Sequence, residues 1–216
     1  QNEQWTTALN GLKPQYNNGA RLEYRYDAES RFEGGNEFLF FDTKNIQITT
    51  ANVSYVELNR LYETYLTPDF FRRGYPYSFI QDLNGDFRIR TLQGSENGAV
   101  EADYSWVHFS LSTPMLLKDQ EIYVYGKFNN YQLNEVNKMY FNPSLEIYEG
   151  VIFLKQGIYN YKFVAETPSS VLLNAVSGTH ALTENRYLIL VYYRYFGDQH
   201  DSLIGFGKTS SFEIMD

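Results

Sequence analysis

The sequence predicts an all-β protein built as two immunoglobulin-like β-sandwich domains in tandem. Apolar and polar residues alternate with a period of two along much of the chain, as they do in half-buried strands. Clusters of Gly, Asn and Pro recur at short intervals between these stretches, which is typical of turns between antiparallel strands. The 216 residues include 20 Tyr and 16 Phe, and both side chains suit a pleated surface. A chain of this length is long enough for two domains of about a hundred residues each.

Composition argues against several classes of protein. The net charge of -8 disfavours non-specific binding to nucleic acid or to an anionic membrane surface. Cysteine is absent, so neither a disulfide framework nor a thiolate metal site is expected. No apolar stretch approaches the roughly 18 residues of a spanning helix, and we expect no direct membrane insertion. The chain begins at Gln1 without Met, so we expect a mature chain or an excised fragment.

The first half of the chain contains several short strand patterns. The clearest alternates Leu22, Tyr24 and Tyr26 with three charged residues. One stretch, residues 57–66, is a modest helix candidate. A polar, Gly-rich break follows at residues 94–98, and we expect the boundary between domains 1–98 and 99–216 there. Strands are expected at residues 20–26, 37–42, 46–50, 54–58 and 87–92.

The second half is organised around residues 122–163. In this stretch, strands alternate with turns, and Gln156-Gly157 forms the last turn before a strand that ends in Tyr161-Lys162-Phe163. Residues 100–112 also alternate, with Tyr104, Trp106 and His108 opposing Val107 and Phe109. Residues 187–196 are almost continuously apolar and are expected to form a central strand. Residues 203–206 and 211–214 are expected to close the sheet.

No group of residues carries a catalytic or metal-binding pattern. The loop of residues 82–86 resembles a calcium loop, but its Gly comes too early and no Glu follows at the right spacing, so a turn is favoured. Asp198, His200 and Asp201 could bind a metal only with a further ligand, and a solvated turn is favoured. No Gly-x-Ser-x-Gly motif is present, and the carboxylates are dispersed. We therefore expect no enzyme activity, no cofactor and no metal.

One pair of basic residues is a candidate contact site for a partner protein. Arg72 and Arg73 follow Phe70 and Phe71 directly. Arginine beside aromatic side chains is a frequent composition at interface hot spots. The alternative is an ordinary loop, and the sequence favours that alternative.

Six short motifs are dispersed along the chain: residues 35–38 (GNEF), 75–77 (YPY), 126–131 (GKFNNY), 183–187 (TENRY), 191–194 (VYYR) and 201–205 (DSLIG). They are similar to the type IX secretion system plug protein family, formerly a domain of unknown function, of exported Bacteroidetes-type proteins. The resemblance spans most of the chain and would correspond to the C-terminal part of a longer protein. It implies a periplasmic protein that closes the periplasmic mouth of a wide outer-membrane translocon β-barrel.

A second resemblance covers only the central stretch. GKFNNY, followed by YNYKFV at residues 159–164, is similar to early-set immunoglobulin-like modules that include glycogen- and starch-binding domains. This resemblance implies sugar contact through Tyr131, which stands where those modules have their first Trp, and through the adjacent Asn129 and Asn130. No Trp follows. The favoured alternative is that Phe128 lies in the core and that Asn129 and Asn130 shape a turn.

The expected function is therefore that of a non-enzymatic interaction protein. Its expected partner is an outer-membrane translocon barrel, and nucleic acid is not expected to bind. A carbohydrate-binding module that takes an oligosaccharide is the main alternative. A hydrolase whose site the sequence does not reveal is a third and weaker alternative.

Overall fold

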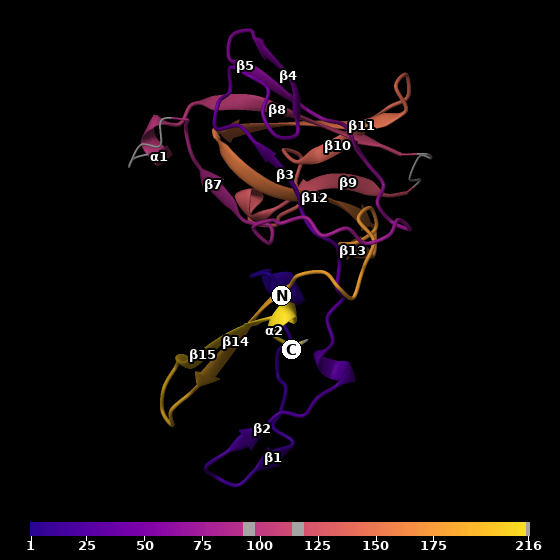
Figure 1. The fold of residues 1–216 in the computed structure, drawn as a ribbon. Coiled ribbons are helices and arrows are strands. Elements are labelled where there is room, and N and C mark those ends of the chain that lie inside the picture. Colours follow the sequence, from indigo (N-terminus) through magenta and orange to yellow (C-terminus); the bar gives the residue numbers. More distant parts are fainter. Residues whose placement is uncertain (93–97, 114–118, 215–216) are drawn as a thin grey trace. The chain divides into compact units, whose positions relative to one another are not determined.

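The computed structural model describes residues 1–92, 98–113 and 119–214 (Figure 1). Strand accounts for 41% of the chain and helix for 7%, which confirms the all-β prediction. The chain forms two compact units. One contains residues 35–180, and the other combines residues 1–34 with residues 181–216.

The unit of residues 35–180 is a β-sandwich whose strands join into one hydrogen-bonded network. The main order is β13-β12-β9-β10-β11-β8-β5-β4, with β3 and β7 paired to β12 and β6 paired to β8. Two short helices, α1 (Gly98–Glu101) and η3 (Lys127–Asn129), interrupt the loops. The strands are β3 (Leu39–Asp42), β4 (Val53–Leu58), β5 (Tyr62–Leu66), β6 (Asp69–Phe70), β7 (Phe87–Ile89), β8 (Tyr104–Ser112), β9 (Glu121–Tyr125), β10 (Lys138–Asn142), β11 (Ile147–Lys155), β12 (Gly157–Thr167) and β13 (Ser170–Leu172).

Strand β12 organises one layer of this sandwich because it pairs with four other strands. Its first half lies between β3 and β7, so that Tyr159 is opposite both Phe41 and Phe87. Its second half pairs with β9 and β13. The rings of Phe41 and Phe87 stack on the ring of Tyr159 at centroid distances of 5.2 and 5.5 Å. Cross-strand aromatic pairs of this kind stabilise a sheet beyond the area that they bury.

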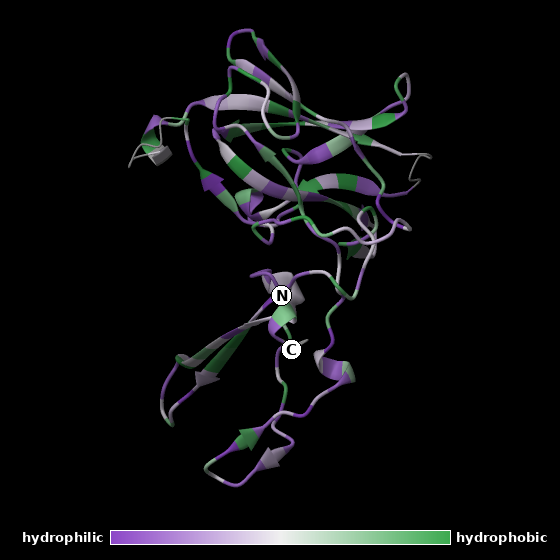
Figure 2. Cartoon of the chain, viewed as in Figure 1, coloured by the Kyte–Doolittle hydropathy of each residue, from purple (hydrophilic) through white to green (hydrophobic). Residues whose placement is uncertain are grey.

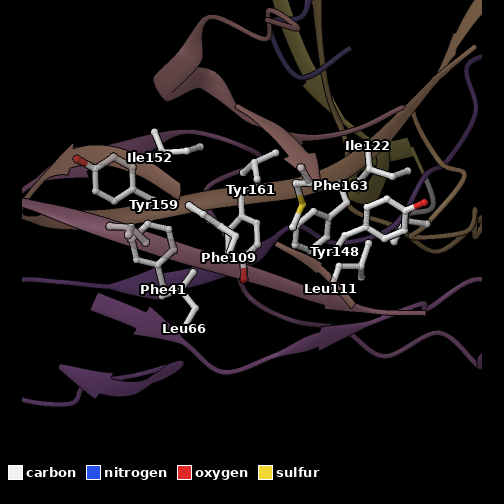
Figure 3. Close-up of a cluster of buried hydrophobic side chains, with 14 of the residues drawn as sticks. Phe41, Leu66, Phe109, Leu111, Ile122, Tyr148, Ile152, Tyr159, Tyr161 and Phe163 are labelled. Atoms are coloured by element: carbon white, nitrogen blue, oxygen red, sulfur yellow. The ribbon is translucent and has the colours of Figure 1, made fainter. Parts of the chain in front are cut away.

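The core lies where the inner side of β12 meets the inner side of β8 (Figure 3). Alternate residues of β8 are buried, and their hydrophobic side chains pack against Tyr159, Tyr161 and Phe163. Phe109 contacts Tyr161 edge to face at 5.2 Å. The same alternation of apolar and polar residues runs along the strands in Figure 2. One side of β8 is therefore core and the other is surface. Both sides of β12 are buried, because Val164 on its other side packs with Tyr123 and Tyr125 in a second, smaller cluster.

The expected boundary between residues 98 and 99 falls inside this unit and has to be corrected. Strand β5 pairs in parallel with β8, and Glu63 lies opposite Trp106. Strands β3 and β7 pair with β12. Residues 93–97, most of the Gly-rich break on which the expectation rested, lie outside the described residues. A polar, Gly-rich stretch indicates a connection, but it does not tell whether the strands on its two sides pair with each other.

The second unit has two separate two-stranded ladders, β1 (Tyr16–Asn17) with β2 (Leu22–Glu23) and β14 (Arg186–Tyr193) with β15 (Ser202–Ser210). Helices η1 (Trp5–Thr7), η2 (Ala28–Ser30) and α2 (Ser211–Ile214) complete it. The expectation that residues 187–196 form a central strand is wrong, because β14 pairs only with β15 among the described strands and is largely exposed. A continuous apolar run indicates a strand. Whether that strand is buried depends on which other parts of the protein cover it, and the run itself does not specify them.

Three smaller expectations are also corrected. Residues 57–66 are the end of β4 and the whole of β5, because Thr64 and Leu66 are buried with a period of two. Residues 46–50 form no strand, and residues 211–214 form α2. The strands expected at residues 54–58, 87–92 and 203–206 are present with shifted ends. The turn at Gln156-Gly157 is confirmed.

We expect Phe41→Ala to lower the free energy of unfolding by about 3–5 kcal/mol, because the ring is fully buried against Phe109, Tyr159 and Tyr161. Equilibrium denaturation in urea, followed by circular dichroism, measures this change. Phe79→Ala is the control, since its side chain is 53% exposed and its loss should change stability much less. Equal effects of the two substitutions would contradict the core described above.

Candidate functional site

A group of exposed and half-buried aromatic side chains lies on the outer side of β4, β5, β8 and β11. Because Val107, Phe109 and Leu111 of β8 are buried, the alternate residues of that strand point outward. Strands β5 and β11 present their own aromatic residues on the same side, in register with β8. We call this surface the aromatic face and define it by Tyr55, Tyr65, Tyr104, Trp106, His108 and Phe153.

Three rings of the aromatic face stack on one another across β8 and β11. Phe153 lies directly opposite Trp106 in the register. Its ring centroid is 4.9 Å from that of Tyr104, with the planes only 16° apart, and 4.7 Å from that of Trp106. The Lys155 ammonium lies 5.2 Å from the Tyr104 centroid. Trp106 and Phe153 still expose 39% and 40% of their surface. The cluster is therefore both ordered and accessible.

The second group of rings runs across β4, β5 and β8. The Tyr65 ring lies 5.6 Å from the Tyr55 ring and stacks on the His108 ring at 4.1 Å. His108 Nε2 is 2.7 Å from the Glu63 carboxylate. Burial raises the pKa of the Tyr65 hydroxyl, and the negative charges of Glu57 and Glu63 raise it further.

The rings of the aromatic face partly cover one another. The ring of Phe153 has a neighbour on each side, and the ring of Tyr65 likewise lies between two rings. Such rings present mainly their edges to solvent. The resulting surface is apolar and shaped by neighbouring side chains, with a polar margin from Glu57, Glu63 and Lys155. Sequence alternation placed Tyr104, Trp106 and His108 on one side of a strand, but the partners on β5 and β11 could not be read from it.

Tyr131, Asn129 and Asn130, which sequence comparison suggested for sugar contact, shape the turn after β9. The Asn129 side chain accepts the Gly126 N–H at 3.3 Å and donates to the Val124 carbonyl at 2.9 Å. Asn130 ends the turn with a φ of 54°, in the left-handed region that Asn tolerates. The Tyr131 ring is half-buried at 5.2 Å from the Tyr125 ring.

Close packing around Gly126 explains why this turn is so compact. A Cβ atom at this position would lie 2.6 Å from the Phe128 ring and 2.7 Å from the Asn160 carbonyl oxygen. Phe128 packs against the core cluster, with its ring 5.7 Å from that of Tyr159. The similarity of GKFNNY to early-set modules thus corresponds here to a packed turn, with Phe128 in the role of a core residue.

Arg72 and Arg73 lie in the loop after β6 and differ in exposure. The Arg72 guanidinium donates to the Glu37 carbonyl at 2.7 Å, and burial lowers the pKa of Arg72. The backbone N–H groups of both residues donate to the Val176 carbonyl. Arg72 therefore ties the loop to two other segments, and Arg73 is the more exposed of the two side chains.

Asp69, three residues before Arg72, has its carboxylate inside the sandwich. It accepts a hydrogen bond of 2.6 Å from the hydroxyl of the buried Tyr161. Burial raises the pKa of Asp69 to about 6, against the opposing effects of the Tyr161 hydrogen bond and the Arg72 charge. A carboxyl in this position protonates near neutral pH, so it couples the stability of the fold to pH.

The remaining acidic candidates have ordinary structural surroundings. Asp82 accepts the backbone N–H groups of Phe38 and Asn84, at 2.6 and 2.5 Å, as a turn residue does. Asp201 pairs with Arg194 at 2.8 Å in the exposed hairpin. Within residues 1–92, 98–113 and 119–214, no three His, Asp or Glu side chains gather as metal ligands would. None of the described helices combines the length and apolar character needed to cross a membrane.

Comparison with solved structures finds a chain of the same fold. A crystal structure of a hypothetical protein from Parabacteroides merdae ATCC 43184 is 31% identical to this chain, with a TM-score of 0.85. The match covers 92% of this chain and 50% of that one, so this chain spans about half the length of the solved chain. No protein-family profile and no curated protein matches the sequence. The likeness fits the β-sandwich described above.

We expect Asp69→Asn to remove one pH-dependent contribution to stability. Because the pKa is higher in the folded chain, the protonated carboxyl stabilises the fold. This contribution is complete below the unfolded pKa of 3.8 and is lost as pH rises through about 6. The loss amounts to about 3 kcal/mol. The unfolding free energy of Asp69→Asn minus that of the parent should therefore rise between pH 4 and pH 7.5. Urea unfolding at several pH values measures it.

The exposed Asp198→Asn variant is the control for this experiment, because it removes one negative charge outside the core. Its stability difference from the parent should stay nearly constant over the same pH range. A constant difference for Asp69→Asn as well would show that the Asp69 carboxyl has an ordinary pKa in the folded chain.

Proposed function

We propose that this chain is a non-enzymatic interaction protein that docks on a partner protein through its aromatic face. The observation that carries the proposal is the ordered, half-exposed cluster of Tyr104, Trp106 and Phe153 on one sheet. Trp and Tyr are the residues that most often dominate binding energy at protein interfaces. Side chains already stacked on one another lose little conformational freedom on binding, which favours affinity.

The partner proposed is the outer-membrane translocon barrel of the type IX secretion system, approached from the periplasm. The resemblance of residues 183–187, 191–194 and 201–205 to the plug family supports this choice. A stopper for a wide pore must be folded and rigid, and the sandwich of residues 35–180 supplies such a body. Its contact should be displaceable by arriving cargo, which an interface of a few aromatic anchors with a polar rim allows.

We expect Trp106→Ala and Phe153→Ala to weaken copurification with the translocon barrel by about 10- to 100-fold each, because both remove a central anchor. Affinity capture with the purified chain as bait measures the effect, and circular dichroism checks that each variant folds. The matched control is Phe79→Ala, which removes a ring that is 53% exposed in the connection between β6 and β7. Binding that is unchanged in both test variants would exclude the aromatic face as the docking surface.

Deletion of the gene tests the plug role itself. We expect the outer membrane to become permeable to large dyes and antibiotics when the translocon is present without its stopper. The control strain lacks both the translocon and this protein, and it should remain tight. Permeability that does not change on deletion would contradict the plug role and would leave the docking surface to be tested separately.

The alternative function, a carbohydrate-binding module, has one specific observation in its favour, the row of exposed rings on a sheet. A sugar stacks on the open face of a ring, however, and here neighbouring rings cover much of those faces. Tyr131, through which the resemblance implies sugar contact, is packed against Tyr125. Both arrangements favour contact with a protein.

We therefore expect no calorimetric signal when the chain is titrated with maltooligosaccharides. Binding in the micromolar range that is lost in Trp106→Ala would assign the aromatic face to sugar recognition. Loss in Tyr131→Ala alone would assign sugar recognition to the turn after β9. Either result would replace the docking proposal with the carbohydrate-binding function.

A further inference from the structure

Strand β4 ends the row of paired strands that carries the aromatic face (Figure 1). One edge of β4 pairs with β5, and no described strand pairs with its other edge. Tyr55 of β4 belongs to the aromatic face, and its ring lies 5.6 Å from that of Tyr65 on the neighbouring strand. The open edge of β4 is therefore also the margin of the candidate docking surface.

The register of the β4–β5 ladder shows which backbone groups face the open edge. Residues of an antiparallel pair alternate between those that bond to each other and those that turn their N–H and C=O groups outward. The Asn59 N–H donates to the Leu61 carbonyl at 3.1 Å, and the register is regular from Leu58 back to Tyr55, so that the bulge of β4 lies before Tyr55. Val56 and Leu58 therefore turn their N–H and C=O groups outward. No hydrogen bond from another described segment reaches these groups.

The side chains of β4 divide between the two sides of the sheet. Tyr55 and Glu57 point to the outer side, with the aromatic face, whereas Val56 packs against the core. Leu58 lies on the inner side with Val56, but at the end of the sheet, where 63% of its surface is exposed. A strand added at this edge covers Leu58 and provides hydrogen-bond partners for the outward backbone groups.

The charge at this edge is negative. Glu57 and Glu63 lie opposite each other and are the only charged residues of β4 and β5. The Glu63 carboxylate is 2.7 Å from His108 Nε2, whereas Glu57 pairs with no Lys or Arg side chain in the described part of the chain. Like charges that lie directly opposite destabilise a sheet. A basic side chain placed beside Glu57 relieves this repulsion.

We propose that an extended segment of the partner protein adds to the open edge of β4 as a further strand. The proposal rests on docking through the aromatic face and identifies the part of the partner that binds at its margin. The partner residue opposite Glu57 is basic, and the residues on either side of it, opposite Val56 and Leu58, are apolar. The next partner residue lies beside Tyr55 and contacts the aromatic face.

The same charge disfavours a second copy of this chain as the added strand. Antiparallel pairing of two β4 strands through Val56 and Leu58 of each copy places Glu57 of one copy opposite Glu57 of the other. Two carboxylates in this position destabilise the pair. The net charge of -8 acts in the same direction, since it repels a second copy and attracts a basic segment.

A proline at the edge tests the proposal in affinity capture of the translocon barrel. Leu58→Pro removes one outward N–H without breaking a hydrogen bond to β5, and it should weaken capture by about tenfold. Its control is Leu58→Val, which keeps the N–H and an apolar side chain and should bind nearly as the parent does. Circular dichroism checks that both variants fold.

A charge reversal gives a second reading that does not depend on proline. In Glu57→Lys the lysine side chain lies opposite Glu63, so the fold should keep its stability. The lysine repels a basic partner residue, and capture should fall by about tenfold. Glu29→Lys is the matched control, because it makes the same change of charge at an exposed position in the other unit, and its capture should equal that of the parent.

Hydrogen exchange in the presence of outer membranes reads the edge directly. The amides of Val56 and Leu58 should exchange more slowly with membranes that contain the translocon than with membranes that lack it. Amides that remain unprotected in both preparations, with capture that depends on Trp106 and Phe153 alone, would overturn the added strand and leave docking through the aromatic face intact. Protection by membranes that lack the translocon would support the added strand and contradict the translocon as partner. Protection in a dimer of the chain alone would overturn the proposal in favour of a second copy.

Discussion

The contact between the inner sides of β12 and β8 is the constraint on which the sandwich depends. Tyr159, Tyr161 and Phe163 on one strand and Val107, Phe109 and Leu111 on the other are nearly free of solvent. Since a strand alternates its side chains, burying these residues places Trp106 and His108 on the opposite surface. The same register that forms the core thus assembles the aromatic face. A substitution that shifted β8 by one residue would remove the core and the candidate docking surface together.

The large residues of this core bring polar groups inside with them. The hydroxyl of Tyr161 needs a partner once the ring is buried, and the Asp69 carboxylate provides it. Burial raises the pKa of the Asp69 carboxyl. It disfavours the charged form more than the Tyr161 hydrogen bond and the Arg72 charge favour it. In this way a core rich in Tyr and Phe acquires a titratable group near physiological pH. The Tyr159 hydroxyl avoids this by donating to the Lys155 carbonyl at 2.8 Å.

Alternation in the sequence was sufficient to predict strands β8 and β11, because each has one buried and one exposed side. Strands β4 and β12 were also predicted, although β4 is largely exposed and β12 is buried on both sides. Alternation could not predict that β5 pairs in parallel with β8 or that β3 lies beside β12, since those pairings join residues far apart in the chain. The aromatic face depends on such pairings and could not be assembled from the sequence. Motif similarity pointed instead to Tyr131, whose neighbours Gly126 and Asn129 determine a compact turn. The alternative prediction, that Phe128 lies in the core and Asn129-Asn130 shapes a turn, is confirmed.

The contrast between β12 and β14 shows how little a strand's composition says about its burial. Both are rich in Tyr and aliphatic residues, yet β12 has strands on each side and β14 pairs only with β15 among the described residues. A strand becomes central when neighbours occupy both of its edges and another layer covers its face. The β14–β15 hairpin meets neither condition in the described chain. Its apolar side chains therefore have the composition of a core and the accessibility of a surface.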